Sequence, residues 1–269
     1  MENLKMSLNG QKLIQLYEEM AREGISRADG KFVKDAYNDF QLHKFRDIVL
    51  PYFQKHSVKT VLDYGCGGSD WEKKGFDDKS NKSALEFLLV ETVSKYEPAR
   101  DLDERKKSAC VVCCDVLEHI FILDAPAVIR DICSYAERLE VLNVACYKSA
   151  ATLPNKENAH ITVRDPMWWK GMLDTISVEF PSLNILLICS TSFTSYQKFE
   201  IWDANEWASS DTFAIDLPLP ILTGFAFQDQ NEITATKNDI SILISEWVEQ
   251  VPEDRLEAWV SFLSFAEKR

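Results

Sequence analysis

Two stretches of this sequence carry side chains whose types and spacing could support chemistry. In the first, residues 60–69, an apolar run ends at Asp63 and then breaks into glycines, with three of the chain's nine glycines within four residues. Glycine allows positive φ angles and lets a ligand approach the backbone closely. In an α/β sheet, ligands bind beyond the carboxyl end of a strand, at such a turn. The stretch therefore predicts a buried strand followed by a ligand-binding turn.

The second stretch is Asp115–Ile120, which follows the apolar run 109–114 and contains Glu118 and His119. The chain has four histidines, and histidine is the usual general base near neutral pH. His119 and His160 each follow a predicted strand, and we expect both to lie at the same edge of the sheet. We therefore predict His119, His160 and Glu118 as the catalytic groups.

The motifs resemble those of a known family. The pattern of apolar strand, Asp63, x, Gly65, x, Gly67 resembles the first motif of class I S-adenosylmethionine (SAM)-dependent methyltransferases. A dinucleotide fingerprint fits less well, because its third glycine would fall at Asp70. Residues 115–119 are similar to the D-x-L-E-H motif that many members carry after the fourth strand. The Asn-Ala-His-x-Thr segment at 158–162, followed by Trp168-Trp169, is similar to a subgroup of bacterial methyltransferases of mostly unassigned substrate.

The resemblance implies a fold and a cofactor. We expect a Rossmann-like α/β fold with a central, mostly parallel seven-stranded sheet flanked by helices. The cofactor would be SAM, and the product S-adenosylhomocysteine. Glu97, at the end of the second strand, would hold the ribose, because one carboxylate can accept hydrogen bonds from both hydroxyls. The other implied cofactor-binding residues are Asp63, Tyr64, Gly65, Cys66 and Gly67 on the amino-acid side and Asp115, Val116 and Leu117 on the methyl side.

The acceptor is less well defined by the resemblance. Transfer to an oxygen of a small molecule or saccharide is our first interpretation, and transfer to nitrogen is the alternative. Asp115, Glu118, His119 and His160 also resemble the D/E-x-x-E-H…H pattern of metal-assisted RNA 2′-O-methyltransferases. A divalent metal held by Glu118, His119 and His160 is thus the alternative to a metal-free pocket. A relative that binds the cofactor or a partner without catalysis is a further alternative. Such a relative would be expected to lack the glycines or the acidic residues of the motifs, and this sequence retains both.

Composition restricts the partners. The formal charge of −13 disfavours nucleic acid, whose phosphates attract clustered Lys and Arg. The sequence contains no apolar run of about 18 residues and no apolar signal core, so we expect a cytoplasmic protein without a membrane segment. Its seven cysteines predict free thiols, and Cys110 and Cys113 should point to opposite faces of a strand. The sequence leaves monomer and homodimer open.

Three regions are predicted along the chain. Residues 1–50 form an N-terminal helical cap with helices at 11–22 and from Phe32 onward, which either covers the sheet or closes over the substrate. Residues 51–205 form the SAM-binding core, with a loop at 70–80, a helix over 124–138, a helix capped by Asp165 and an antiparallel last strand at 198–202. Residues 206–269 form an extension with helices at 240–248 and 255–265.

Overall fold

Apolar runs rich in Val, Ile, Leu and Cys form the middle of one sheet, and they are nearly continuous because both faces of a parallel sheet are covered. The computed structural model describes residues 4–27, 31–34, 40–201 and 216–218, which belong to one compact unit, Met1–Ile221. The sheet has eight strands, in the order β11-β10-β9-β7-β6-β3-β4-β5. The parallel strands are β3 (Thr60–Tyr64), β4 (Thr92–Glu97), β6 (Ser108–Cys114), β7 (Ala136–Ala145) and β9 (Asn184–Ser190). The antiparallel strands are β5 (Leu102–Asp103), β10 (Ser195–Ile201) and β11 (Asp216–Pro218).

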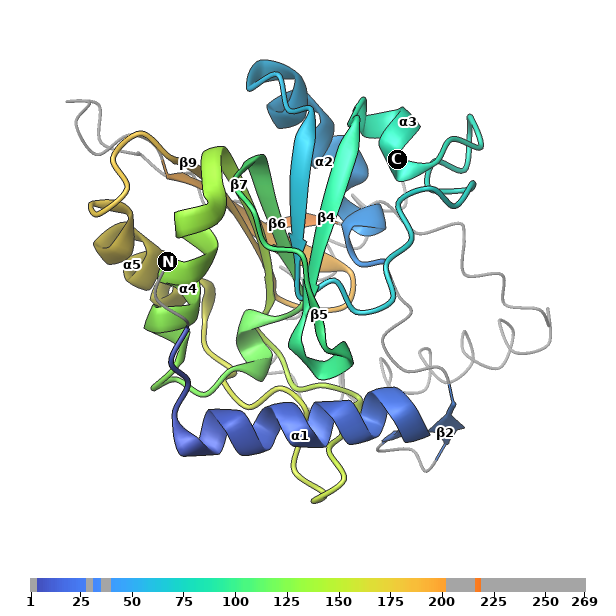
Figure 1. Ribbon diagram of the computed structural model, residues 1–269, viewed down its shortest axis with the longest axis vertical. Helices are drawn as coiled ribbons and strands as arrows, with labels where there is room; N and C mark the ends of the chain where they lie inside the picture. The colour runs from blue at the N-terminus through green and yellow to red at the C-terminus, as the bar shows by residue number, and fades with distance from the viewer. Residues whose placement is uncertain (1–3, 28–30, 35–39, 202–215, 219–269) are drawn as a thin grey trace, which may run out of the picture. The chain divides into compact units, whose positions relative to one another are not determined.

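Helices cover both faces of this sheet (Figure 1). On one face, α4 (Ala125–Tyr135) and α5 (Pro166–Ser177) pack on β6, β7 and β9. On the other, α2 (Leu42–Lys55) and the short α3 (Ala84–Leu88) pack on β3 and β6. Cys113 belongs to the first core and Cys110 to the second, which confirms that they point to opposite faces. The predicted α/β fold, with a mostly parallel sheet and flanking helices, is confirmed, although the sheet has eight strands and not seven.

The strand order fixes where a ligand can bind. Numbered along the chain, the five parallel strands lie in the order 2-1-3-4-5, a doubly wound arrangement. The direction of winding reverses between β3 and β6, so the connections after these two strands leave toward opposite faces. The crevice at such a switch point, outside the carboxyl ends of the strands, is where open α/β sheets bind ligands.

The helix α1 (Leu8–Glu23) lies apart from the two helical layers. It crosses the carboxyl edge of the sheet (Figure 1), where Leu13 and Tyr17 line a cavity. Gly24, with φ at +99°, ends the helix, and the chain continues into a small second sheet of β1 (Ile25–Arg27), β2 (Phe32–Val33) and β8 (Ala151–Thr152).

Several predicted boundaries need correction. The helix expected from Phe32 is wrong at its start, because Phe32 and Val33 satisfy their backbone groups by pairing with β1. Residues 35–39 lie outside the described part of the chain, and the next described helix begins at Leu42. The helix expected over 124–138 ends at Tyr135, and β7 begins at the next residue, because Ala136 and Leu139 already pair with β6. The last strand, expected at 198–202, is β10, which is antiparallel as predicted but starts at Ser195, is described as far as Ile201 and is followed in the sheet by β11. The helices expected at 240–248 and 255–265 lie outside the described residues, and so do the residues of the extension other than 216–218.

Two local predictions are confirmed. Asp165 caps α5 by accepting a hydrogen bond from the Trp168 N–H, with Pro166 at the first helical position. Residues 65–83 form no helix or named strand, but Trp71 and Phe76 are buried, so the loop is packed against the core. Among the described residues, no helix combines the length and apolarity needed to cross a bilayer.

The start of α1 is fixed by one buried carboxylate. Asp124 accepts hydrogen bonds from the Ser7 N–H at 2.8 Å and the Ser7 hydroxyl at 2.7 Å, while the Ser7 Oγ accepts from the Gly10 N–H. A Cβ on Gly10 would lie 2.5 Å from an Asp124 oxygen, so the close approach of helix and carboxylate requires glycine.

We expect Asp124→Ala to speed amide hydrogen exchange in 8–23 while leaving β6 and β7 protected. Unchanged exchange in α1 would contradict this anchoring role.

A second buried carboxylate makes stability depend on pH. Glu140 in β7 is fully buried, and its described contact is a hydrogen bond from the Cys133 thiol at 3.1 Å. Burial raises the pKa of Glu140 to about 8. The folded state therefore retains a proton that the unfolded state has already lost, so the free energy of unfolding should fall as pH rises from about 4.5 to about 8.

We expect Glu140→Gln to flatten this pH dependence and to stabilise the protein at pH 8.5 relative to wild type. Urea unfolding at pH 5.5 and 8.5 measures both effects. The control is Glu91→Gln, because Glu91 is exposed. An equally steep loss of stability in Glu140→Gln would show that other groups cause it.

Candidate functional site

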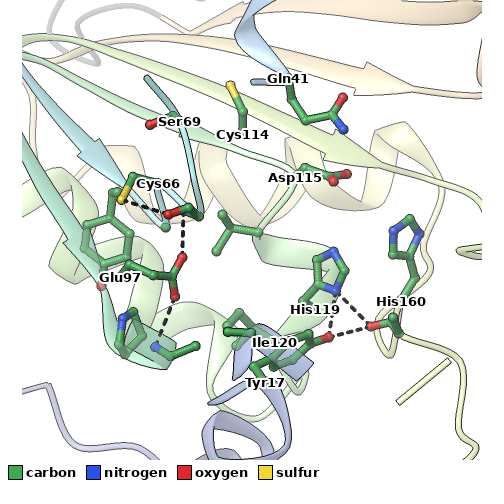
Figure 2. Close-up of a pocket in the computed structure, with 18 of the residues that line it drawn as sticks. Tyr17, Gln41, Cys66, Ser69, Glu97, Cys114, Asp115, His119, Ile120 and His160 are labelled. Atoms are coloured by element: carbon green, nitrogen blue, oxygen red, sulfur yellow. Dashed lines mark hydrogen bonds between the residues drawn. The ribbon is translucent and has the colours of Figure 1, made fainter. Parts of the chain in front are cut away.

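A cavity of about 390 Å³ opens at the switch point between β3 and β6. Its walls come from the turn after β3, the end of β4, the residues after β6 and β7, and one side of α1. In Figure 2, Cys66 and Glu97 lie on one side of this cavity, and Asp115, His119 and His160 lie on the other. The cavity thus brings the two predicted motifs to opposite ends of a single space.

The turn after β3 depends on glycine. Gly65 and Gly67 have φ angles of +71° and +52°, in the left-handed region that favours glycine. The N–H groups of Gly65 and Cys66 both donate to the carbonyl of Tyr96, at 2.7 and 3.1 Å. A Cβ on Gly65 would lie 2.4 Å from Cγ2 of Val116. Both the backbone angle and the neighbouring side chain therefore exclude larger residues at position 65.

Asp63, near the end of β3, fixes the loop that follows the glycine turn. Its buried carboxylate accepts hydrogen bonds from the Ser69 hydroxyl at 2.5 Å and the Trp71 indole N–H at 2.7 Å. Burial raises the pKa of Asp63, and the two hydrogen bonds oppose that rise. The Lys95 ammonium donates to the carbonyl of Ser69 at 2.6 Å. Asp63 borders the cavity, but its described hydrogen bonds serve the loop that follows the glycines.

Glu97 ends β4 and faces the glycine turn. Its Oε2 accepts from the Gly67 N–H at 2.8 Å, and its Oε1 accepts from the Ala99 N–H at 3.1 Å (Figure 2). Burial raises the pKa of Glu97, and these two hydrogen bonds oppose the rise. Each carboxylate oxygen can accept more than one hydrogen bond, so the group retains capacity for ligand hydroxyls.

Asp115 follows β6 in a conformation that is uncommon for a residue with a side chain. Its φ is +60°, and its N–H donates to the carbonyl of Asn143 at 3.0 Å. Aspartate tolerates the left-handed region better than most residues, yet backbone strain of this kind gathers at functional sites. The conformation breaks β6 and begins the turn that carries Val116 and the 3-10 turn η2 (Leu117–His119).

His119 lies where α1 meets the end of the sheet. Its Nδ1 is 2.7 Å from the Tyr17 hydroxyl and 3.0 Å from the carbonyl oxygen of Ala159. Desolvation by the surrounding protein lowers the pKa of His119 to about 4, with His160 lowering it further and Asp115 opposing the shift. The ring is therefore neutral at physiological pH.

His160 is held beside His119 by its own segment. Its Nδ1 contacts the carbonyl of Tyr147 at 2.5 Å, and the rings of the two histidines meet edge to face with centroids 4.8 Å apart. The Asn158 Oδ1 accepts from the His160 N–H at 3.1 Å. Thr162 donates from its N–H to the carbonyl of Glu118 and from its hydroxyl to the carbonyl of Ile120. The polar residues of the 158–162 motif thus fix this loop against residues 118–120.

Glu118 is fully buried and does not line the cavity. Its Oε1 accepts from the Ala145 N–H at 2.5 Å, whereas its Oε2 has no hydrogen-bond partner among the described residues. Burial raises the pKa of Glu118 well above its usual range, and the neighbouring Asp115 raises it further. One potential ligand atom from each of Asp115, Glu118, His119 and His160 lies within 4.8 Å of the others.

The remaining predicted residues divide into two groups. Tyr64, Cys66 and Val116 line the cavity, and the Tyr64 hydroxyl donates to Asp131 at 2.8 Å. Burial raises the pKa of the Cys66 thiol to about 12, so this thiol stays protonated. Leu117, predicted as a cofactor-binding residue, is instead fully buried in the core and does not line the cavity. The 3-10 turn directs Leu117 inward while it leaves His119 at the cavity.

Some lining residues were missed by the sequence interpretation. Tyr17 counted there only as an apolar position of a helix, and Tyr147 follows β7 without any recognisable motif. Both place polar groups beside the histidines, the Tyr17 hydroxyl on His119 and the Tyr147 carbonyl on His160. No signal in the sequence could reveal them, because their roles depend on long-range packing.

The chain was also compared with known proteins. A scan against protein-family models, a search of curated proteins and a search of solved structures found no match for this chain.

Proposed function

We propose that this protein transfers a methyl group from SAM to an oxygen of a small molecule or saccharide. The observation that carries the proposal is the shared cavity at the switch point, which joins the turn of Gly65 and Gly67, the carboxylate of Glu97 and residues 115–119. A cavity of this volume is in the range that holds small ligands and cofactors. The bound donor would supply a methyl group on a sulfonium, whose carbon–sulfur bond breaks with its electron pair staying on sulfur.

The residues on the β3 and β4 side fit a donor of this kind. The glycine turn would receive the amino-acid end, because it lets a ligand approach the backbone closely. Glu97 would hold the ribose through the lone pairs that its two backbone hydrogen bonds leave available. Asp63 would act through Ser69 and Trp71, by fixing the loop, and not through a direct hydrogen bond to the ligand.

The histidine side fits the acceptor. His119, His160 and Tyr147 line the part of the cavity next to Asp115, where an acceptor hydroxyl could approach the methyl group. Methyl transfer between a positioned donor and acceptor depends chiefly on proximity and orientation. A hydroxyl must also lose its proton, which calls for a base or for a cation that lowers the hydroxyl pKa. With a pKa of about 4, His119 binds protons weakly, so it is a poor general base by itself.

The cofactor site is tested by titration with S-adenosylhomocysteine in a calorimeter. We expect the wild-type protein to bind it at one site, and Gly65→Val to abolish binding, because the new side chain would collide with Val116 and strain a φ of +71°. Retained affinity in Gly65→Val would show that the glycine turn is not part of the cofactor site.

The matched control is Gly171→Ala in α5, where an added Cβ meets nothing within 4 Å. We expect it to bind like wild type and to be slightly more stable, by about 0.5–1 kcal/mol. Circular dichroism of Gly65→Val checks that loss of binding is not loss of fold. No binding by the well-folded wild type would instead indicate a relative that no longer uses this cofactor.

The acceptor end is tested by His119→Ala. We expect methyl transfer to fall by about 10²-fold, because the acceptor would lose a group that positions it, while the affinity for S-adenosylhomocysteine stays near that of wild type, since His119 lies at the acceptor end. Transfer of a labelled methyl group to a panel of hydroxyl compounds and saccharides measures the rate. His56→Ala serves as control, because His56 does not line the cavity. An unchanged rate in His119→Ala would exclude the residue from the chemistry.

A further inference from the structure

We infer that Asp115, Glu118, His119 and His160 form a binding site for one divalent transition-metal ion at the acceptor end of the cavity. The four residues come from the turn after β6 and the loop after β7, and their potential ligand atoms lie within 4.8 Å of one another. Binding of the ion does not depend on methyl transfer. Its role in catalysis, described below, rests on the proposed function.

The tautomers of both histidines are those of metal ligands. A carbonyl oxygen only accepts hydrogen bonds, so the contact of His160 Nδ1 with the Tyr147 carbonyl requires a proton on that Nδ1. A proton on His119 Nδ1 likewise fits its contacts, because the Tyr17 hydroxyl then donates to the Ala159 carbonyl and accepts from the ring. In a neutral ring the lone pair then lies on Nε2. Histidine ligands commonly donate their other ring N–H to a backbone carbonyl or carboxylate, which fixes both the tautomer and the ring orientation.

The buried carboxylate of Glu118 gives a second, independent observation. Its side chain is fully buried, one oxygen is occupied by the Ala145 N–H, and the other has no hydrogen-bond partner among the described residues. A buried polar oxygen without a partner is costly. A bound cation would satisfy this oxygen and would be attracted by the Asp115 side chain beside it.

The donor set indicates which ions would bind. Two imidazole nitrogens and two carboxylate oxygens suit Mn²⁺, Fe²⁺, Co²⁺ and Zn²⁺ better than Mg²⁺ or Ca²⁺, which prefer oxygen alone. Glu118 lies behind the cavity wall, whereas Asp115, His119 and His160 line the cavity, so an ion held by these residues would border the cavity.

Such an ion would supply one chemical effect at the acceptor end of the cavity. It would lower the pKa of an acceptor hydroxyl, which would release its proton to solvent water more readily. The acceptor would therefore be a hydroxyl compound, whose oxygen forms the bond to the methyl carbon as the carbon–sulfur electron pair passes to sulfur.

Mn²⁺ binding to the full chain, freed of metal with a chelator and without donor or acceptor, is the first test. We expect electron paramagnetic resonance to show one tightly bound Mn²⁺ per chain. Glu118→Gln keeps an oxygen for the Ala145 N–H, and His160→Asn keeps a donor for the Tyr147 carbonyl, but each removes a ligand. We expect each variant to bind Mn²⁺ at least about tenfold more weakly.

The matched control is His56→Asn, which removes a histidine outside the cavity and should bind Mn²⁺ like wild type. No Mn²⁺ binding by the wild-type chain, or equal binding by all three variants, would overturn the inference. Co²⁺ spectra give a second measurement that needs no variant. We expect d–d bands without a thiolate charge-transfer band, and a thiolate band would place the ion on cysteines instead.

Titration with S-adenosylhomocysteine in parallel separates the two proposals. If the product binds and Mn²⁺ does not, only the cation site is wrong. If Mn²⁺ binds at these residues and the product does not, the cation site stands and the methyltransferase proposal fails.

Discussion

The parallel pairing of β3 with both β4 and β6 positions the glycine turn, Glu97 and Asp115. Tyr64 pairs with Tyr96 on one side, and Asp63 pairs with Val112 on the other. Because the strands run in the same direction, their next residues leave the sheet at one edge. The glycine turn, Glu97 and Asp115 are therefore neighbours although they span fifty residues of sequence. A sheet of the same strands in antiparallel order would place them at opposite ends.

Glu118 and Glu140 are both fully buried, but their surroundings differ. Glu140 lies in the middle of the sheet, accepts one hydrogen bond from a thiol and does not line the cavity. Glu118 has a backbone N–H on one oxygen and two histidines and an aspartate close by. Both are shifted toward the protonated form by burial. Only Glu118 lies among groups that could share a ligand, so its burial has a chemical interpretation that the burial of Glu140 lacks.

Local signals in the sequence predicted much of the fold. Apolar runs ending in glycine or acid located β3 and β6, the family resemblance placed the end of β4 at Glu97, and the Asp165-Pro166 pair located the start of α5. The helix expected from Phe32 failed because the same alternation of apolar residues also suits a strand, and pairing with β1 decided the outcome. The boundary between α4 and β7 could not be read from the sequence either, since Leu139 fits a helical face as well as a strand.

The site was predictable where it depends on motifs and not where it depends on packing. Glu97, Asp115, His119 and His160 do border one cavity, and their spacing along the chain reflects the ends of successive strands. The inward turn of Leu117, the hydrogen bonds of Asp63 to Ser69 and Trp71, and the contact of Tyr17 with His119 could not be read from sequence. Each arises from side chains that approach one another only after the sheet and α1 have packed.

The contact between position 65 and Val116 also has an evolutionary meaning. A side chain at 65 would occupy the volume of the Val116 methyl groups, so the two motifs share one small space across the cavity wall. Among descendants of this chain, the two positions should not drift independently. Any lineage that gained bulk at 65 would need to lose it at 116, and the left-handed backbone would still restrict the choice. Covariation between the two motifs would then record a steric contact and not a shared contact with a ligand.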